Sequence, residues 1–179
     1  MEPIKRMNRE LVFEGSILNV YKDTVCVSNG NLSKWDFVGK CGAAAALPIT
    51  DDGKIILVKQ WRNALDRFTV EIPAGGQEPS EEMITCAMRE LEEETGYKAG
   101  NMDFLVSVEP TVAFCNERID VFLATNLIKT HTNFDEEEEI ELCLYSMEEL
   151  LDMIDQGTLR DSKTVAAILA YYRKTMKQK

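Results

Sequence analysis

Length, composition and charge limit what this chain can be. It has 179 residues, of which 45% are hydrophobic, and a formal net charge of −11 at pH 7. These values allow one full-sized core with a small appendage. The negative charge argues against binding to nucleic acid or to an anionic membrane surface, because both would repel such a chain.

The chain contains five scattered cysteines, which are Cys26, Cys41, Cys86, Cys115 and Cys143. They show no CxxC and no Cys/His ligand spacing, so a zinc site is not expected. Reduced thiols in a cytoplasmic protein are the simple interpretation. Residues 1–10 are charged and lack the apolar run of a signal peptide. No window approaches a membrane span, so no membrane association is expected.

The N-terminal residues are predicted to form a small antiparallel β unit. Apolar and polar residues alternate in residues 11–27, and several side chains there are β-branched. This pattern is typical of two strands, here joined near residues 14–16. Asn29-Gly30 predicts a hairpin turn, and residues 32–38 follow as a third strand. A unit this small is expected to bury no core of its own. We therefore expect residues 1–41 to pack on the main domain or on a second subunit.

Residues 42–179 are predicted to form the main domain. Apolar or alternating runs predict strands at 42–48, 54–60, 68–72, 102–110, 119–125 and 140–145. Ser146 is expected to cap a helix over residues 146–155, and a last helix begins at Asp161 or Ser162. Mixed strands with few helices indicate an α/β fold with helices on both faces of a sheet.

Residues 72–97, IPAGGQEPSEEMITCAMRELEEETGY, are the centre of the sequence. A Gly-rich turn precedes Ser80, whose hydroxyl can accept from the N–H groups of a first helical turn. Glu81 and Glu82 then suit the positive end of the helix dipole. Gly96 provides a stop that needs no Cβ. The predicted helix therefore runs from Ser80 to about residue 95, with an apolar face made of Ile84, Ala87, Met88 and Leu91.

This helix contains three glutamates, Glu90, Glu93 and Glu94, on a face next to its apolar face. They lie together because spacings of three and four residues bring helical side chains to the same side. Like charges placed in this way destabilise an isolated helix slightly. One interpretation is a solvated acidic face. The other is a site for a hard divalent cation, because Mg²⁺ binds a few carboxylates together with substrate phosphates and water.

The spacing of this motif resembles the Nudix box. Gly75 is followed after five residues by Glu81, and after seven more by the run RELEEETGY at 89–97. Every charged and glycine position of that pattern matches, and Tyr97 stands where an aliphatic residue is usual. The resemblance implies a Nudix α/β/α sandwich with a mixed sheet. It also implies hydrolysis of a nucleoside diphosphate linked to another moiety.

By this resemblance, Glu90, Glu93 and Glu94 bind the metal ion together with the backbone carbonyl of Ala74. The expected ion is Mg²⁺, with Mn²⁺ as an alternative. Such ions neutralise the diphosphate and activate a water. Arg89 is expected to hold a glutamate in place through a salt bridge rather than to touch the substrate.

The flanks of the box resemble those of the ADP-ribose pyrophosphatases. The matching segments are VKQWR at 58–62, EIPAG at 71–75 and WDFV at 35–38. In that subfamily the N-terminal unit is exchanged across a homodimer, and each site uses residues of both chains. Trp35 would then stack on adenine and Asp36 would hydrogen-bond its edge. A hairpin aromatic that packs on the small sheet is the alternative for Trp35.

The resemblance also assigns the remaining site residues. Arg62 would hold a phosphate, because its planar guanidinium can donate two parallel hydrogen bonds to phosphate oxygens. A surface ion pair is the alternative for Arg62. Family members often use a glutamate on a loop beyond the box as general base, which here indicates Glu138 or Glu139. Glu93 is the alternative base, and the acidic run would then be a solvated loop. Glu117 is expected to position the substrate.

One departure concerns the loop after Pro110. ADP-ribose hydrolases usually have Pro-Gly there, whereas this chain has Thr111-Val112-Ala113 after the proline, a change that affects the expected pocket for the terminal ribose. The expected function is Mg²⁺-dependent hydrolysis of ADP-ribose to AMP and ribose 5-phosphate. Alternatives are a Nudix enzyme for other nucleotide sugars, dinucleotides or oxidised nucleotides, and a non-catalytic nucleotide-binding regulator. The usual mark of the regulator would be loss of one of the three metal-binding glutamates.

Overall fold

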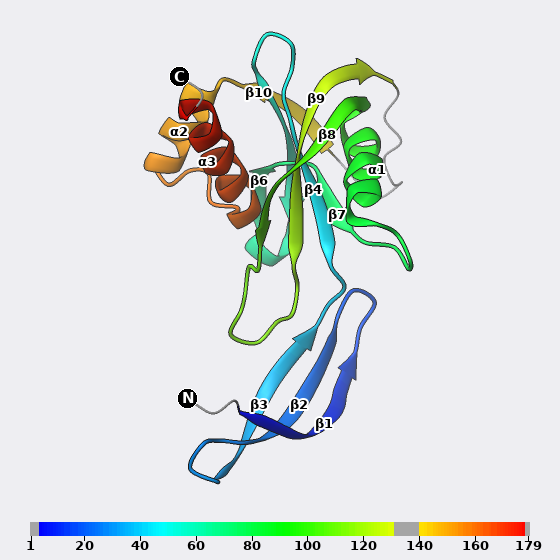
Figure 1. The fold of residues 1–179 in the computed structure, drawn as a ribbon, viewed down its shortest axis with the longest axis vertical. Coiled ribbons are helices and arrows are strands. Elements are labelled where there is room, and N and C mark those ends of the chain that lie inside the picture. Colours follow the sequence, from blue (N-terminus) through cyan, green and yellow to red (C-terminus); the bar gives the residue numbers. More distant parts are fainter. Residues whose placement is uncertain (1–3, 131–139, 178–179) are drawn as a thin grey trace. The chain divides into compact units, whose positions relative to one another are not determined.

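The structure is a computed structural model that describes residues 4–130 and 140–177 (Figure 1). The chain forms two compact units, which are described separately. The N-terminal unit consists of Met1–Gly42 together with Glu109–Arg118. The main unit consists of Ala43–Val108 and Ile119–Lys179.

The N-terminal unit contains three strands, as expected from the sequence, which are β1 (Lys5–Glu14), β2 (Asn19–Cys26) and β3 (Leu32–Gly39). Strand β1 begins at Lys5, in the charged segment before the predicted start at residue 11. They form an antiparallel sheet in chain order. Gly30, with a φ of 85°, makes the hairpin turn between β2 and β3. Such a φ favours glycine because glycine has no Cβ.

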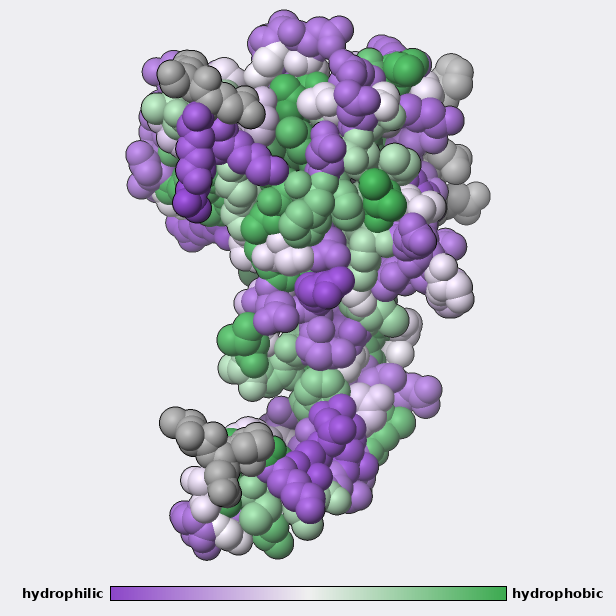
Figure 2. Space-filling model, viewed as in Figure 1, coloured by the Kyte–Doolittle hydropathy of each residue, from purple (hydrophilic) through white to green (hydrophobic). Residues whose placement is uncertain are grey.

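This sheet has little core of its own. Among its described residues, Val25 is the single buried hydrophobic side chain, with 5% exposure. Eight large apolar residues are exposed, and apolar atoms reach the surface of this unit in Figure 2. They are Ile4, Met7, Leu11, Val12, Phe13, Ile17, Leu32 and Trp35. In addition to the backbone pairing of its strands, the sheet is stabilised by Arg9. Arg9 binds Asp23 with two hydrogen bonds of 2.7 and 2.6 Å, and its guanidinium carbon lies 3.7 Å from the ring centre of Phe37.

The segment 109–118 belongs to this unit, although in the sequence it connects two strands that belong to the main unit. The Val38 N–H donates to the Phe114 carbonyl at 2.7 Å, and the Lys40 N–H donates to Oδ1 of Asn116 at 2.9 Å. Lys40 Nζ also pairs with Glu117 at 2.5 Å. The loop is thereby fixed to the end of β3.

The main unit contains the remaining elements in this order: β4 (Ala43–Pro48), β5 (Ile55–Arg62), η1 (Asn63–Leu65), β6 (Arg67–Glu71), β7 (Ala74–Gly76), α1 (Met83–Thr95), β8 (Tyr97–Val108), β9 (Ile119–Lys129), β10 (Ile140–Tyr145), α2 (Met147–Asp155) and α3 (Ser162–Met176). One sheet has the order β7-β4-β9-β8 and the other β10-β5-β6. The pair β4–β9 is parallel and the other pairs are antiparallel, so the first sheet is mixed.

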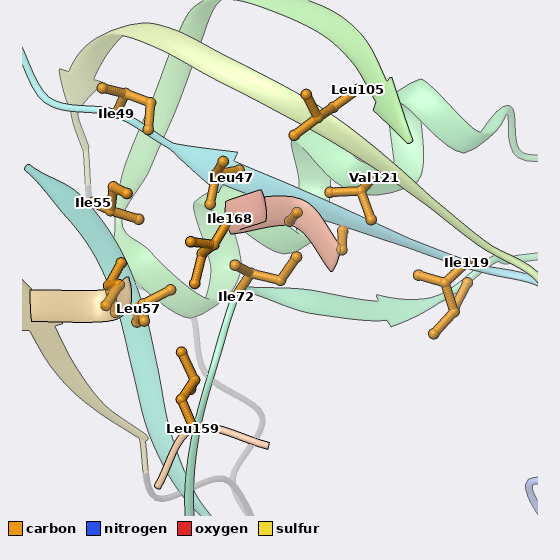
Figure 3. Packing of buried hydrophobic residues seen from close by; sticks show 14 residues of the cluster. Leu47, Ile49, Ile55, Leu57, Ile72, Leu105, Ile119, Val121, Leu159 and Ile168 are labelled. Carbon is orange, nitrogen blue, oxygen red and sulfur yellow. The ribbon is translucent and has the colours of Figure 1, made fainter. Parts of the chain in front are cut away.

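Strand β4 explains why helices cover both faces. All of its residues are buried, and their side chains alternate between the two faces of the sheet. The odd-numbered residues join the large core under α2 and α3, in which Leu47 and Ile168 lie close together (Figure 3). Ala44 and Ala46 instead pack with residues of α1. Figure 1 shows α1 on one side of β4 and β9 and the other two helices on the opposite side, which confirms the α/β/α sandwich.

Two details of helix α1 differ from the prediction. The helix begins at Met83, and its N-cap Glu82 makes no side-chain cap hydrogen bond. Ser80 cannot be the cap because it has a φ of 68°, which is a left-handed conformation outside the helix. Met88, predicted on the apolar face, is 43% exposed, since the buried face is centred on Cys86, Ala87 and Leu91.

The C-terminal stop of α1 and the cap of α2 are confirmed. Gly96 has a φ of 69°, and its N–H donates to the Glu92 carbonyl at 2.8 Å. Ser146 and Glu149 form a capping box at the start of α2. All five cysteines are free thiols. No helix of the described chain is long and apolar enough to span a membrane.

Candidate active site

The segment that enters α1 is fixed on both sides. The predicted Gly-rich turn is a short strand, β7, in which Ala74 pairs with Ala45 of β4. The N–H of Ile72 donates to Thr164 Oγ1 at 2.9 Å, and the N–H of Ala74 donates to Glu94 Oε2 at 3.2 Å. This arrangement brings the backbone of Ala74 beside a carboxylate of the helix.

Gly75 is needed for the close approach of Glu90. A Cβ built at Gly75 would lie 2.1 Å from Glu90 Oε1, which is far inside contact distance. At Gly76, in contrast, a Cβ would meet no heavy atom within 4 Å. The Glu90 carboxylate therefore rests against the backbone of β7, and only the first of the two glycines is required for it.

Arg89 joins three carboxylates. Its Nε donates to Glu81 at 3.0 Å, and its Nη1 donates to Glu90 at 2.6 Å and to Glu93 at 3.0 Å. The hydrogen bonds from Arg89 lower the pKa of Glu81 to about 2, and the same bond raises the pKa of Arg89. Arg89 thus holds glutamates in defined orientations, including Glu81, which lies before the helix and not in its first turn.

Cys86 contacts this cluster, although the sequence analysis assigned it no role. Its thiol is buried and donates to the Gly76 carbonyl at 3.4 Å and to the Gly75 carbonyl at 3.7 Å. Burial, followed by the negative charge of Glu81, raises the pKa of Cys86 to about 12. It therefore stays a neutral thiol at physiological pH and supports the glycine backbone from below.

The donor set at this site fits a hard divalent cation. Glu90, Glu93, Glu94 and the Ala74 carbonyl supply only oxygen, which is what Mg²⁺ prefers. Within residues 4–130 and 140–177, no group of three or more His, Cys, Asp and Glu side chains is arranged so that it could hold a metal ion by itself. An ion such as Mg²⁺ would therefore need waters and substrate phosphates as ligands in addition to these carboxylates.

Arg62 is held by a buried polar network. Its Nε and Nη2 donate to the two carboxylate oxygens of Glu71 at 2.7 and 2.8 Å. Glu71 also accepts from Lys163 Nζ at 2.5 Å and from Thr69 at 2.6 Å. Hydrogen bonding to Glu71 raises the pKa of Arg62, and the charge of Glu94 adds to this effect. Arg62 therefore interacts electrostatically with the glutamate cluster.

The sequence held one signal for this network that the prediction did not use. Lys163 stands in the first turn of α3, where a cation opposes the helix dipole. It is also only 8% exposed. A buried lysine at this end of a helix requires carboxylate partners, which here are Glu71 and Asp161.

The pH dependence of stability should report on Glu71. Burial alone would raise its pKa, but the hydrogen bonds from Arg62 and the charge of Lys163 outweigh burial and lower the pKa from 4.5 to about 2. Because the folded-state pKa is the lower one, Glu71 stabilises the fold above about pH 4.5, and this stabilisation is lost as pH falls toward 2. We expect Glu71→Gln to be less stable than wild type at neutral pH and the difference to shrink in acid.

Thermal unfolding across a pH series measures this difference. Glu141→Gln is the control, because Glu141 is 67% exposed in its pair with Lys59 and contributes little. A stability difference between Glu71→Gln and wild type that stays constant from neutral pH to about pH 3 would contradict the assignment.

The other predicted residues lie elsewhere. Trp35 and Asp36 are on β3 of the N-terminal unit, where Trp35 is 47% exposed and Asp36 pairs with Lys22. Glu117 is in the same unit, bound to Lys40. Glu138 and Glu139 lie outside the described residues. The structure thus brings together Ala74, Arg89, Glu90, Glu93 and Glu94 in the main unit, with Arg62 within electrostatic reach.

The sequence also matches a model of a known family over most of this region. The NUDIX domain model matches residues 40–168, which include β7, α1 and the Arg62 network. The chain belongs to the Nudix family. Members of this family generally use divalent metal cations, in agreement with the oxygen donors of the site.

Similar proteins extend the Nudix assignment to nearly the whole chain. An ADP-ribose pyrophosphatase of Bacillus subtilis (strain 168) is 39% identical over 92% of this chain and 90% of its own. A methanol dehydrogenase activator of Bacillus methanolicus is 37% identical with the same coverage of both chains. A crystal structure described as an ADP compounds hydrolase has a TM-score of 0.89 over 99% of this chain and 97% of its own, and its 20% identity shows the fold alone.

Proposed function

We propose that this Nudix hydrolase cleaves the diphosphate of ADP-ribose with Mg²⁺, giving AMP and ribose 5-phosphate. The observation that carries the proposal is the 39% identity to the B. subtilis ADP-ribose pyrophosphatase along 92% of the chain. The identity spans both units, so it covers residues proposed to bind the nucleotide as well as those proposed to bind metal. The glutamates of the box are all present.

The residues of the main unit divide the chemistry among them. Glu90, Glu93, Glu94 and the Ala74 carbonyl would hold the metal ion, which neutralises the diphosphate and lowers the pKa of a water when bound. Water adds to one phosphorus as the bond between that phosphorus and the bridging oxygen breaks, and the bridging oxygen leaves with the other phosphate. Arg89 orients Glu90 and Glu93 through its hydrogen bonds of 2.6 and 3.0 Å.

Arg62 and the base complete the site. Among the described residues, Nη1 of Arg62 has no hydrogen-bond partner, so this edge of the guanidinium is available to phosphate oxygens. We propose Glu138 or Glu139 as the base that takes a proton from the attacking water, with Glu93 as the alternative. Glu117 is proposed to position the substrate.

We further propose a cytoplasmic homodimer in which the N-terminal unit of each chain contributes to the site of the other. Within residues 4–42 eight large apolar side chains are exposed and one, Val25, is buried, which supports a second copy as the partner that covers them. Trp35 would stack on the adenine and Asp36 would hydrogen-bond its edge.

The first test is turnover of ADP-ribose with Mg²⁺ beside ADP-glucose, NADH and diadenosine polyphosphates at equal concentration. We expect the highest kcat/KM for ADP-ribose and no turnover in excess EDTA. Equal turnover of all substrates would refute the assignment of ADP-ribose as the substrate, but it would not contradict the proposed metal site. Replacement of Mg²⁺ by Mn²⁺ in the same assay tests the choice of ion.

A second candidate is activation of another enzyme, which the 37% identity to the methanol dehydrogenase activator favours. Retention of Glu90, Glu93 and Glu94 supports hydrolysis as part of whatever role the chain has. Absence of turnover on every substrate of the panel would favour a purely regulatory protein.

Trp35→Ala should raise KM for ADP-ribose by roughly 10- to 100-fold, the loss expected when one base loses its aromatic platform. Because Trp35 is 47% exposed, the variant should keep nearly all of its folding stability. Trp35→Phe retains a stacking face and should recover most of the affinity. Equal losses of affinity and of stability in Trp35→Ala would show instead that Trp35 packs the small sheet.

A further inference from the structure

The start of α3 carries a lysine that has no part in the chemistry proposed above. Lys163 is 8% exposed, and its Nζ lies 2.5 Å from Glu71 Oε2 and 3.1 Å from Asp161 Oδ2. A buried cation at the positive end of a helix loses hydration and opposes the dipole, so both carboxylates are needed to stabilise it. Such a placement is costly for a residue with no function beyond filling space.

The contacts of Glu71 link Lys163 to Arg62. The Glu71 carboxylate accepts four hydrogen bonds, two from Arg62, one from Thr69 and one from Lys163. A carboxylate offers about four lone-pair positions, so this one is fully used and cannot rotate freely. The bidentate bond then fixes the plane of the Arg62 guanidinium, and the Arg62 side chain is 41% exposed.

We infer that Lys163 is a positioning residue, which holds Arg62 through Glu71 in the orientation that binds the substrate diphosphate. The inference rests on the proposed function, in which Arg62 binds a phosphate. Charge supports it as well as geometry. Two cations, Arg62 and Lys163, balance two carboxylates, Glu71 and Asp161, and loss of Lys163 would leave a net negative charge beside the diphosphate.

The same end of α3 also positions the metal side of the site. Thr164, which is fully buried, accepts from the Ile72 N–H at 2.9 Å and donates to Asp161 at 2.5 Å. Ile72 begins the segment that carries Ala74 to the glutamates. The Asp161–Thr164 turn therefore holds both the phosphate-binding arginine and the backbone oxygen proposed as a metal ligand.

Lys163→Met tests the inference, because methionine keeps the length of the side chain without its charge. The dissociation constant of ADP-ribose is measured by calorimetry in EDTA, where no turnover occurs, and KM and kcat are measured with Mg²⁺. We expect Kd and KM to rise roughly tenfold, with kcat changed far less, because a misplaced binding group weakens both ground-state and transition-state contacts. Lys163→Arg should restore binding, and the exposed Lys174→Met should match wild type.

A double-mutant cycle separates positioning from stability. In an Arg62→Met background, Lys163→Met should cause no further rise in Kd, because the residue through which it acts is gone. Lower thermal stability of Lys163→Met with unchanged Kd would overturn the inference, as would additive effects in the cycle. If Lys163→Met does not fold, Glu71→Gln, which keeps shape and size, takes its place with the same expectation.

Failure of the proposed function would look different. An unchanged Kd in Arg62→Met, or no hydrolysis of ADP-ribose by wild type, would remove the role of Arg62 and the inference with it. A raised Kd in Arg62→Met together with an unchanged Kd in Lys163→Met would overturn the inference alone.

Discussion

Replacement of Glu94 by glutamine is expected to lower turnover by about 10²–10³-fold while the protein stays folded, the loss typical of removing one preorganised polar group from an active site. Glu94 is 4% exposed and accepts from the Ala74 N–H at 3.2 Å. Glutamine can keep this hydrogen bond through its amide oxygen but cannot supply the negative charge that a cation requires. The measurements are kcat for ADP-ribose at saturating Mg²⁺ and thermal unfolding.

Glu92 provides the matched control on the same helix. It pairs with Lys98 at 3.1 Å and has no place in the proposed site, so Glu92→Gln should retain wild-type turnover. Glu93→Gln should lose turnover as Glu94→Gln does, since both side chains are proposed metal ligands. Unchanged turnover in both of these variants would refute the metal-site assignment.

Gly75→Ala is expected to reduce turnover by about 10²-fold with little effect on stability. A Cβ at Gly75 would lie 2.1 Å from Oε1 and 2.4 Å from Oε2 of Glu90, so the carboxylate must move. The end of a glutamate side chain can move to another rotamer at small cost to the fold. Displacing a reacting or ligating group by about 1 Å nevertheless costs about 10² in rate.

Gly76→Ala makes this test specific, because the two glycines are neighbours and a Cβ at Gly76 would meet nothing within 4 Å. It should retain near wild-type turnover. Measuring both variants over a range of Mg²⁺ concentrations should show a weaker apparent affinity for the ion in Gly75→Ala alone. Equal activity of the two variants would mean that the position of the Glu90 carboxylate does not matter.

Local patterns predicted most of the elements. The alternation in residues 11–27, the Asn29-Gly30 turn and the alanine-rich strand all correspond to observed structure, because each is determined by neighbours in sequence. Gly96 ends α1 for the same reason, since its left-handed backbone is a local requirement. The glutamate spacing placed Glu90 and Glu93 on one side of the helix, where both contact Arg89.

Contacts between distant residues could not be predicted in this way. Ser80 has a side chain that is typical of a helix N-cap, yet its backbone adopts a φ of 68°. Glu81, which lies outside the helix, accepts a hydrogen bond from Arg89. Tertiary hydrogen bonding here outweighs the local capping preference. Glu71 and Lys163 are 92 positions apart, and nothing in the spacing of either one indicates the other.

The attachment of segment 109–118 to β3 has a consequence for how this protein can be altered. The N-terminal unit is assembled from two stretches of chain, so a hybrid that takes only residues 1–42 from a relative would pair a foreign strand with a native loop. In such a hybrid, the N–H groups at positions 38 and 40 would belong to the foreign strand. Their acceptors, the Phe114 carbonyl and Asn116 Oδ1, would belong to the native loop, so these hydrogen bonds could be lost. Insertions in this loop and changes at the end of β3 should therefore occur together among related sequences, and a functional graft must transfer both stretches at once.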